Sequence, residues 1–422
     1  MSTSPSNTTQ IESFPSSKPA FLRRVRIRGY KSIAFCDVTL EPLTILVGRN
    51  GSGKSNFLDA LGFLRDVLAL NLNEAVKRHG GAAAIPCRQL DERSVSIEIE
   101  CGWEKFDTSQ IQCATYRIDI EFTKNEQPKI RFESCTINYT GNCDRFTSTD
   151  GSVVFSSNDR DLPEKLYWPT GRPILAYTDG EYYEFYKRLT ALLTYNFSPR
   201  SIRQLQLVSY EGYLEPDGSN LASVIDSMQE YSDDDVARVG QFLSAIVREI
   251  DRFDVVRYGE YETIRFWMKA NDPNRSEAFD ASSVSDGTLR ALAALISVYQ
   301  SSIPNGSPSV VAIEEPETAL HPAAMQALVS ALDEAILRTQ IVLTTHSPDL
   351  LDAEEVKPEN VRVVQMIDGA TVIGRVDETS VEIVKRKLST LGGLERDNQL
   401  TADLEDRTRL LKLSRNGAEM PG

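Results

Sequence analysis

The alternation of hydrophobic and polar residues predicts a chain that opens with strands and then a helix. From Phe21, apolar and polar positions alternate and then become fully apolar, which predicts a strand pair followed by a buried strand at Leu43–Val47. From Lys54 to about Leu70 apolar residues recur at helical spacing. The ordered part of the chain therefore begins with three strands and one helix.

The middle of the chain predicts two regions of different character. Residues 93–155 hold four alternating stretches separated by turn-forming residues (SVSIEIE, ATYRIDIEF, KIRFESCTINY and SVVFS), which predict an antiparallel β-subdomain. Residues 180–250 are predicted to be mostly helical, most clearly in EYYEFYKRLTALLTY and DDDVARVGQFLSAIVREI. Residues 251–269 return to a strand-like pattern.

The last part of the chain predicts alternating helices and strands. We expect a helix at 286–300, a strand at 309–314, a helix at 322–337, a strand at 340–345, a strand pair at 361–366 and 371–376, and a helix at 379–390. No internal repeat is present, and no sustained heptad pattern predicts a long coiled-coil arm.

Composition and charge narrow the class of protein. The chain has 422 residues, of which 41% are hydrophobic and 25% charged, so a mostly disordered chain is excluded and two or three domains are expected. The formal net charge of −15 argues against a protein that coats nucleic acid over its whole surface. Eight Lys or Arg and three acidic residues nevertheless fall within residues 21–65. This basic segment forms either a DNA-facing surface or the lining of a phosphate site, and we favour the second.

The placement of cysteines and histidines and the length of the hydrophobic runs argue against a zinc protein, a disulfide-rich protein and a membrane protein. The six Cys form no CxxC pair, and the three His form no ligand spacing with them, so neither a zinc site nor a disulfide framework is predicted. No apolar run approaches the roughly 18 residues of a membrane helix. We therefore expect a soluble cytoplasmic protein with no membrane partner.

The strongest chemical signal is a phosphate-binding loop at residues 48–55. GRNGSGKS matches G-x4-G-K-[ST] in full, between an apolar strand and an amphipathic helix. The glycines let backbone N–H groups curl around phosphates, Lys54 reaches the β- and γ-phosphates of ATP, and the Ser55 hydroxyl ligates Mg²⁺. The predicted nucleotide-binding residues of this loop are Gly48, Asn50, Gly51, Ser52, Gly53, Lys54, Ser55 and Asn56.

A second signal is the apolar strand SVVAIEEPE, which ends in carboxylates. This pattern is typical of a Walker B strand. Glu314 is predicted to hold Mg²⁺, and Glu315 to orient and activate the attacking water. A buried strand that ends in a polar turn is the alternative interpretation when the motif is taken alone.

Two further motifs carry polar residues at the ends of predicted elements. Ser285 and Gly287, in VSDGTLR, precede an apolar helix whose N-terminus is either an ordinary capped end or an anion site. Because the P-loop lies far upstream, a phosphate held by a second subunit is a plausible partner for this segment. His346, in TTHSP, follows an apolar strand and is interpreted as a γ-phosphate sensor rather than a structural histidine. His321 is predicted to lie in a subunit-contact loop, without a catalytic role for its imidazole.

These four motifs, in this order, resemble the ABC-type ATPase head of the SMC/RecF/OLD branch, in its small members without coiled-coil arms. RIRGYKSI, the P-loop, LEPDGSNLA, SDGTLR, EEPE and THSPDLL carry the resemblance across residues 21–390. It implies an α/β fold: an ABC-type P-loop NTPase head with a mixed sheet, an antiparallel β-subdomain and a helical insertion. It also implies a head-to-tail homodimer, or a higher oligomer, with two ATP molecules at the interface. Glu315, His346 and Lys54 would be catalytic, Ser55 and Glu314 would hold Mg²⁺, and Ser285 and Gly287 would contact the ATP of the other subunit.

The predicted organisation combines these motifs with the pattern of elements. It comprises a disordered tail (1–19), an ATPase lobe with the P-loop (20–92), a β-rich subdomain (93–178), a helical insertion (179–252), an ATPase lobe with the signature, Walker B and His switch (253–395), and a charged tail (396–422).

The chain departs from the family pattern at four points. Asp286 stands where the signature usually has glycine, Thr288 where it has glutamine, and Glu314 where Walker B has Asp. The glutamine of the Q-loop is not located by the sequence. A carboxylate near a γ-phosphate is unfavourable unless it points away or is paired, so Asp286 raises a question about the contact between subunits.

The resemblance leaves several functions open. We favour an ATP-driven dimerising switch that controls a separate effector, such as a nuclease, in defence against phage or foreign DNA, because no nuclease-like cluster of acids follows His346. The alternative is a RecF-like DNA repair or maintenance ATPase that binds DNA directly. A non-hydrolysing ATP-binding scaffold is disfavoured by Glu315, and a transporter ATPase by the long separation of Lys54 from Glu314.

Overall fold

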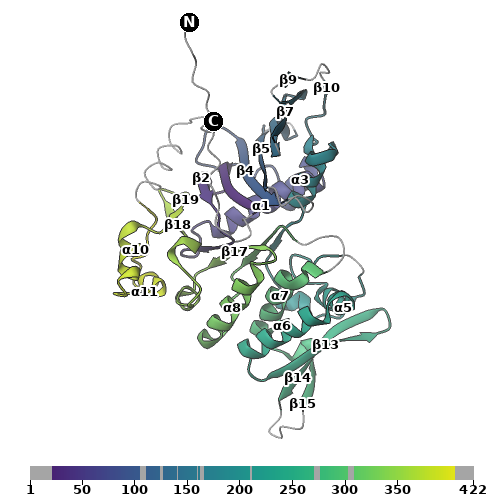
Figure 1. Ribbon diagram of the computed structural model, residues 1–422, viewed down its shortest axis with the longest axis vertical. Helices are drawn as coiled ribbons and strands as arrows, with labels where there is room; N and C mark the ends of the chain where they lie inside the picture. Colours follow the sequence, from purple (N-terminus) through teal and green to yellow (C-terminus); the bar gives the residue numbers. More distant parts are fainter. Residues whose placement is uncertain are drawn as a thin grey trace.

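The structure is a computed structural model, and it describes residues 21–104, 111–123, 127–139, 141–158, 160–161, 166–209, 212–269, 276–302 and 308–403. The predicted tail at 1–19 and most of the one at 396–422 lie outside these residues. The antiparallel strands between residues 94 and 167 occupy the upper part of the molecule, and most helices of the middle and C-terminal parts lie below them (Figure 1).

A six-stranded mixed sheet forms the centre of the fold. Its order is β11 (Leu192–Tyr195), β16 (Val310–Glu314), β17 (Gln340–Thr345), β3 (Leu43–Val47), β18 (Val361–Ile367) and β19 (Ala370–Arg375). The first five strands are parallel, and β19 returns antiparallel to β18. Because the carboxyl ends of parallel strands meet at one edge, the residues that follow β3, β16 and β17 lie together there.

Alternating side chains of this sheet enter two hydrophobic cores. Leu43, Ile45 and Val47 of β3 pack in the core with helices α5 (Leu221–Tyr231), α6 (Asp233–Ile246), α7 (Asp286–Tyr299) and α8 (Met325–Ala335), whereas Leu46 packs in the core with α1 (Lys54–Ala69). Successive side chains of a strand point to opposite faces, so α1 and α7 lie on opposite sides of the central sheet. Burial on both faces explains why all five residues of β3 are buried and why four of them are apolar.

The predicted antiparallel β-subdomain is confirmed, and it also contains the first two strands. The sheet order is β10 (Leu166–Tyr167), β8 (Ser152–Ser157), β7 (Asn142–Thr149), β6 (Lys129–Tyr139), β5 (Ile111–Glu121), β4 (Ser94–Glu104), β1 (Leu22–Tyr30) and β2 (Ile33–Thr39), with β9 (Arg160–Asp161) paired to β8. Along β1, Val25 and Ile27 face the core with α1, and Arg24 and Arg26 pair with acidic residues of β2 and β4 on the other face. The charges of Arg24 and Arg26 are therefore neutralised by carboxylates within the sheet.

Each helix that the sequence predicts is present, but several are shorter than predicted, and the structure adds short helices that the sequence pattern does not predict. The remaining helices are α2 (Leu72–Arg78), α3 (Gly180–Thr190), α4 (Pro199–Ile202), α9 (Pro348–Leu351), α10 (Glu378–Lys385) and α11 (Leu391–Arg396). The predicted helix at 379–390 ends early because Lys387 adopts a left-handed conformation with φ of 56°. The first turn predicted at 322–324 is a 3₁₀ turn ahead of α8.

One predicted helix is wrong over its last residues. The stretch 181–195 is helical only as far as Thr190, and Leu192–Tyr195 form β11 instead. The structural reason is the open edge of β16, whose backbone pairs with β11 in parallel register from Leu192 to Tyr195. A four-residue apolar run has no period that separates a buried strand from a helix.

A small sheet extends the helical region. It consists of β12 (Gln206–Leu207), β14 (Tyr261–Lys269) and β13 (Ile250–Tyr258), with β15 (Ser276–Asp280) paired to β14. Phe253, Ile264 and Phe266 of this sheet belong to the same core as α5 and α6. The strand-like pattern at 251–269 is thus confirmed as a hairpin that packs on the helices.

A buried carboxyl group ties the antiparallel sheet to the segment that leads into α3. The Glu133 side chain is 1% exposed. Its Oε2 accepts a hydrogen bond from the Ile174 N–H at 2.7 Å, and its Oε1 accepts from the Leu175 N–H at 3.1 Å and the Tyr116 hydroxyl at 3.0 Å. Burial raises the pKa of Glu133 to about 7 from an ordinary value of 4.5.

This raised pKa predicts a pH-dependent contribution to stability. A carboxyl group whose pKa is higher in the folded state stabilises the fold fully below its unfolded pKa, and that contribution is lost as the pH rises through the folded pKa. We expect the melting temperature of wild type minus that of Glu133→Gln to fall as the pH rises from 4.5 to about 7. Thermal denaturation across this range measures it, and a constant difference would contradict the assignment.

Candidate functional site

The P-loop joins β3 to α1 at the carboxyl edge of the central sheet. Gly53 has φ of 104°, and a Cβ there would lie 2.0 Å from the Thr371 Oγ1 of β19, so only glycine fits. The Lys54 side chain is buried, and its Nζ donates hydrogen bonds to the carbonyl oxygens of Gly48 at 2.6 Å and Arg49 at 3.2 Å. The lysine is thus held inside the loop that it is predicted to serve.

A cluster of oxygen and amide groups lies next to this loop. The Ser55 hydroxyl donates to Glu314 Oε2 at 3.0 Å, and the Asn196 Nδ2 donates to the same oxygen at 3.4 Å. Hydroxyl and carboxylate oxygens are the protein ligands that Mg²⁺ prefers, so Ser55 and Glu314 fit the predicted ion. In the adjoining loop, the Ser52 Oγ is buried without a hydrogen-bond partner among the described residues. Its O–H group is suited to donate a hydrogen bond to a phosphate oxygen.

Glu315 follows β16 with a strained backbone. Its φ is +42°, a value that is uncommon for a residue other than glycine and often marks functional sites. Its N–H donates to the Thr344 carbonyl at 3.0 Å, which fixes the turn against the end of β17. The Glu315 Oε1 lies 3.3 Å from the His346 Nδ1, and both side chains are partly exposed. The two predicted catalytic side chains are therefore adjacent.

Several carboxylates lie near the P-loop lysine and affect its pKa. Burial lowers the pKa of Lys54, and the nearby carboxylates of Glu315, Glu317 and Glu314 oppose that shift. Burial raises the pKa of Glu314, and the charge of Glu315 adds to the rise, while the hydrogen bond from Ser55 opposes it. A group of carboxylates around one lysine is electrostatically suited to a bound cation.

The signature segment caps α7 on the other side of the central sheet. The Ser285 Oγ accepts a hydrogen bond from the Thr288 N–H at 3.2 Å. The Asp286 carboxylate, which departs from the family pattern, forms an ion pair with Arg203, and the Arg203 guanidinium also donates to the Val284 carbonyl at 2.8 Å. Pairing reduces the repulsion that an unpaired carboxylate would exert on a phosphate.

At Gly287 the backbone of the signature segment packs closely against the loop that follows the Walker B strand. A Cβ at Gly287 would lie 2.2 Å from the Ala319 carbonyl oxygen, so the two backbones touch. We expect Gly287→Ala to lower the free energy of unfolding by about 1–3 kcal/mol through overpacking. Gly240→Ala in α6 is the matched control, because a Cβ there meets nothing closer than 4.0 Å. Urea denaturation of both variants measures the effect, and equal stability of the two would contradict the close approach.

Two predicted residues have partners that clarify their positions. The Asn56 Nδ2 donates to the Ser32 Oγ at 2.6 Å, and that oxygen lies 2.7 Å from the Thr371 Oγ1, so Asn56 supports the loop through the β1–β2 turn. The His321 Nδ1 accepts a hydrogen bond from the Ala323 N–H at 3.2 Å. Direct nucleotide contact by Asn56 and a subunit contact at His321 remain predictions.

The sequence missed Asn196, which the structure places beside Glu314. Backbone hydrogen bonds from Asn196 N–H to the Pro216 carbonyl (2.9 Å) and from Ser198 N–H to the Asp217 carbonyl (3.0 Å) hold this turn. The segment LEPDGSNLA thereby positions Asn196 at the end of β11. The available signal is a polar residue directly after a short apolar run, but the sequence pattern predicts helix over that run.

Two family models match adjacent parts of the chain. One, described as "AAA ATPase domain", matches residues 21–171, and the other, described as "AAA domain, putative AbiEii toxin, Type IV TA system", matches residues 171–352. These ranges contain the P-loop, the signature, Walker B and His346. Over residues 21–352 the chain is therefore similar to AAA-type ATPase domains.

The individual proteins that the chain resembles are distant from it in sequence or match only a short segment. The DNA replication and repair protein RecF of Arthrobacter sp. (strain FB24) is 44% identical over 45 residues, which are 10% of this chain and only 11% of that RecF. An SMC head solved in complex with the C-winged helix domain of ScpA is 13% identical, with a TM-score of 0.46 over 84% of this chain and 97% of that one. The SMC head domain from Thermotoga maritima is 15% identical, with a TM-score of 0.41 over 85% and 99% of the two chains.

Within the residues that the structure describes, no helix combines the length and the apolar character that crossing a membrane requires.

Proposed function

We propose that the protein binds and hydrolyses ATP, dimerises around it, and acts as a switch that controls a separate effector such as a nuclease in defence against phage or foreign DNA. One observation carries the ATPase part: Lys54, Ser55, Glu314, Glu315 and His346 meet at one edge of the central sheet. The family model that mentions a putative AbiEii toxin supports a defence role.

Each residue at this edge has a role that follows from its chemistry. The P-loop N–H groups and Lys54 would bind the phosphates, and Ser55 and Glu314 would hold Mg²⁺. When bound, Mg²⁺ would neutralise charge on the phosphates. Glu315 would accept a proton from the attacking water, and the His346 ring, 3.3 Å away through Nδ1, would orient that carboxylate.

The position of the signature supports a composite site between two chains. The α1 helix that carries Lys54 and the α7 helix that begins after Ser285 pack in different cores on opposite sides of the central sheet. In a head-to-tail pair, the Ser285–Gly287 segment of one chain would face the P-loop of the other. The capped N-terminus of α7, with Asp286 paired to Arg203, would then meet the γ-phosphate.

The proposed control of an effector is tested by measuring the native mass of the complexes that the protein forms. The Glu315→Gln variant, co-expressed with the neighbouring genes, is purified with and without ATP and measured by native mass spectrometry. An ATP-stabilised assembly that contains a second protein supports control of an effector. An ATP-dependent homodimer alone would contradict it.

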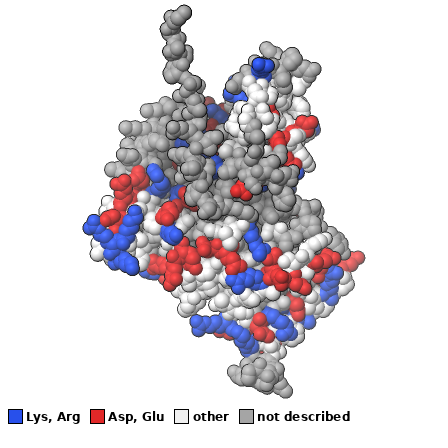
Figure 2. Space-filling view, in the orientation of Figure 1, with Lys and Arg blue, Asp and Glu red and all other residues white. Residues whose placement is uncertain are grey.

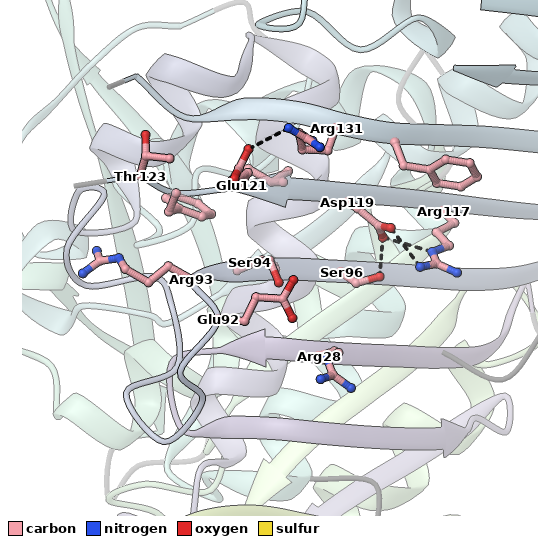
Figure 3. A pocket seen from close by; sticks show the side chains of 14 residues that line it. Arg28, Glu92, Arg93, Ser94, Ser96, Arg117, Asp119, Glu121, Thr123 and Arg131 are labelled. Carbon is pink, nitrogen blue, oxygen red and sulfur yellow. Dashed lines mark hydrogen bonds and ion pairs between the residues drawn. The ribbon is translucent and has the colours of Figure 1, made fainter. Parts of the chain in front are cut away.

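A cavity on the outer face of the antiparallel sheet favours a second candidate function. The cavity has a volume of about 650 Å³ and lies over β1, β4, β5 and β6. Four arginines and three carboxylates line it (Arg28, Arg93, Arg117, Arg131, Glu92, Asp119 and Glu121). Figure 3 shows Arg28 on β1 and Arg117 on β5, with β4 between these two strands, and it shows Arg117 paired to Asp119 and Arg131 to Glu121. The excess of arginine suits a phosphodiester and favours the RecF-like alternative of direct DNA binding.

Salt-dependent binding tests this alternative. We would compare wild type with Arg117→Ala/Arg131→Ala for binding to a fluorescent DNA duplex in ATP, at rising salt. Direct DNA binding predicts a steep loss of affinity with salt, with a shallower slope in the variant. Binding that is weak and independent of salt would remove this function. On the face shown in Figure 2, acidic and basic side chains are intermixed. We therefore place the DNA contact of this alternative in the arginine-lined cavity and not on that face as a whole.

A further inference from the structure

Glu317 is the one carboxylate of the EEPE strand end that the mechanism above does not use. Its side chain is 6% exposed. Its Oε1 accepts a hydrogen bond from the Thr345 hydroxyl at 2.5 Å, and its Oε2 is buried without a partner among the described residues. Burying a carboxylate oxygen without a hydrogen bond is costly, and an apolar side chain would fill the same space at a lower cost.

The contacts of Glu317 lead to His346. The hydroxyl of Thr345, which is fully buried, accepts a hydrogen bond from the Ser347 N–H at 3.0 Å and donates to Glu317. These bonds fix the residues on either side of His346. In the same place, the Glu315 N–H donates to the Thr344 carbonyl at 3.0 Å. The turn after β16 and the turn after β17 are therefore joined at two points that flank the pair Glu315–His346.

We propose that Glu317 is a positioning residue for ATP hydrolysis, which holds the His346 turn so that the imidazole meets the Glu315 carboxylate. This inference rests on the proposed function, because it takes Glu315 as the group that accepts the proton. Glu317 touches neither nucleotide nor water in this account and acts only through Glu315 and His346. The Glu315 and His346 side chains are already partly exposed. Without the bond between Glu317 and Thr345, they would be free to separate.

The role predicts a loss in rate rather than in binding. We expect Glu317→Gln and Glu317→Ala to lower kcat for ATP hydrolysis by about 10- to 100-fold, a typical cost of a small misplacement of catalytic groups. The affinity for a fluorescent ATP analogue should stay within about twofold of wild type, because the P-loop contacts are unchanged. Thr345→Val removes the same hydrogen bond from the other side and should lower kcat in the same way. Glu382→Gln is the matched control, since Glu382 is exposed on α10 and pairs with Arg386.

A double-variant cycle separates positioning from a general structural role. If Glu317 acts through Glu315, adding Glu317→Gln to Glu315→Gln should lower the residual rate by less than about twofold. Losses that multiply in the double variant, a wild-type rate for both Glu317→Gln and Thr345→Val, or a loss confined to ATP binding would each overturn the inference. A wild-type rate for Glu315→Gln would instead show that the proposed function is wrong, so the two failures are distinguishable.

Discussion

The Glu315→Gln variant is expected to bind ATP with unchanged affinity, hydrolyse it about 10²–10³ times more slowly, and accumulate as an ATP-bound dimer. The substitution keeps the shape of the side chain and the N–H bond to Thr344 that fixes the turn. It removes the negative charge that lies 3.3 Å from His346 and that would accept the proton of the attacking water. Phosphate release measures the rate, and light scattering with ATP measures the dimer.

Glu382→Gln serves as the control for this variant as well, because it makes the same chemical change on exposed helix α10. It should hydrolyse ATP at the wild-type rate and show no trapped dimer. A Glu315→Gln protein that turns over ATP at the wild-type rate would contradict the assignment of the base.

The Lys54→Ala variant is expected to lose ATP binding, with a dissociation constant raised by about 100-fold or more. Its Nζ is buried among the P-loop carbonyls and faces the carboxylates of Glu315, Glu317 and Glu314, so its loss removes the positive charge that balances them. Titration calorimetry with ATP and Mg²⁺ measures the change.

Lys77→Ala is the matched control for this effect. Lys77 lies in α2, where its exposed ammonium group pairs with Glu74, so ATP binding should be preserved. Near-wild-type affinity in Lys54→Ala would show that the phosphates bind elsewhere.

Local motifs made much of the site predictable from the sequence. The P-loop, the Walker B strand and the strand before His346 each combine a buried strand with a polar turn, and these patterns span only a few residues. The resemblance to an ATPase head implied catalytic roles for Lys54, Glu315 and His346, and these residues follow parallel strands whose carboxyl ends lie at one edge of the sheet. The structure brings Glu315 and His346 to 3.3 Å, as that geometry requires.

Other features depend on contacts between distant segments and could not be predicted in this way. Leu192–Tyr195 form a strand only because β16 offers an open edge, and Asn196 reaches Glu314 only because that strand exists. The role of Asp286 likewise depends on Arg203, which precedes it by a long stretch of chain. Contacts between residues that are distant in sequence produce no local periodic pattern, so they cannot be predicted from the pattern of hydrophobic and polar residues.

The composite site between two chains is tested most directly by mixing two inactive variants. Lys54→Ala disables the P-loop, and Ser285→Arg disables the signature, so neither protein alone should hydrolyse ATP. If the signature of one chain completes the P-loop site of the other, mixed dimers contain one intact site. The mixture should then regain about a quarter of the wild-type rate when the chains pair at random. A mixture as inactive as its two components would contradict the account.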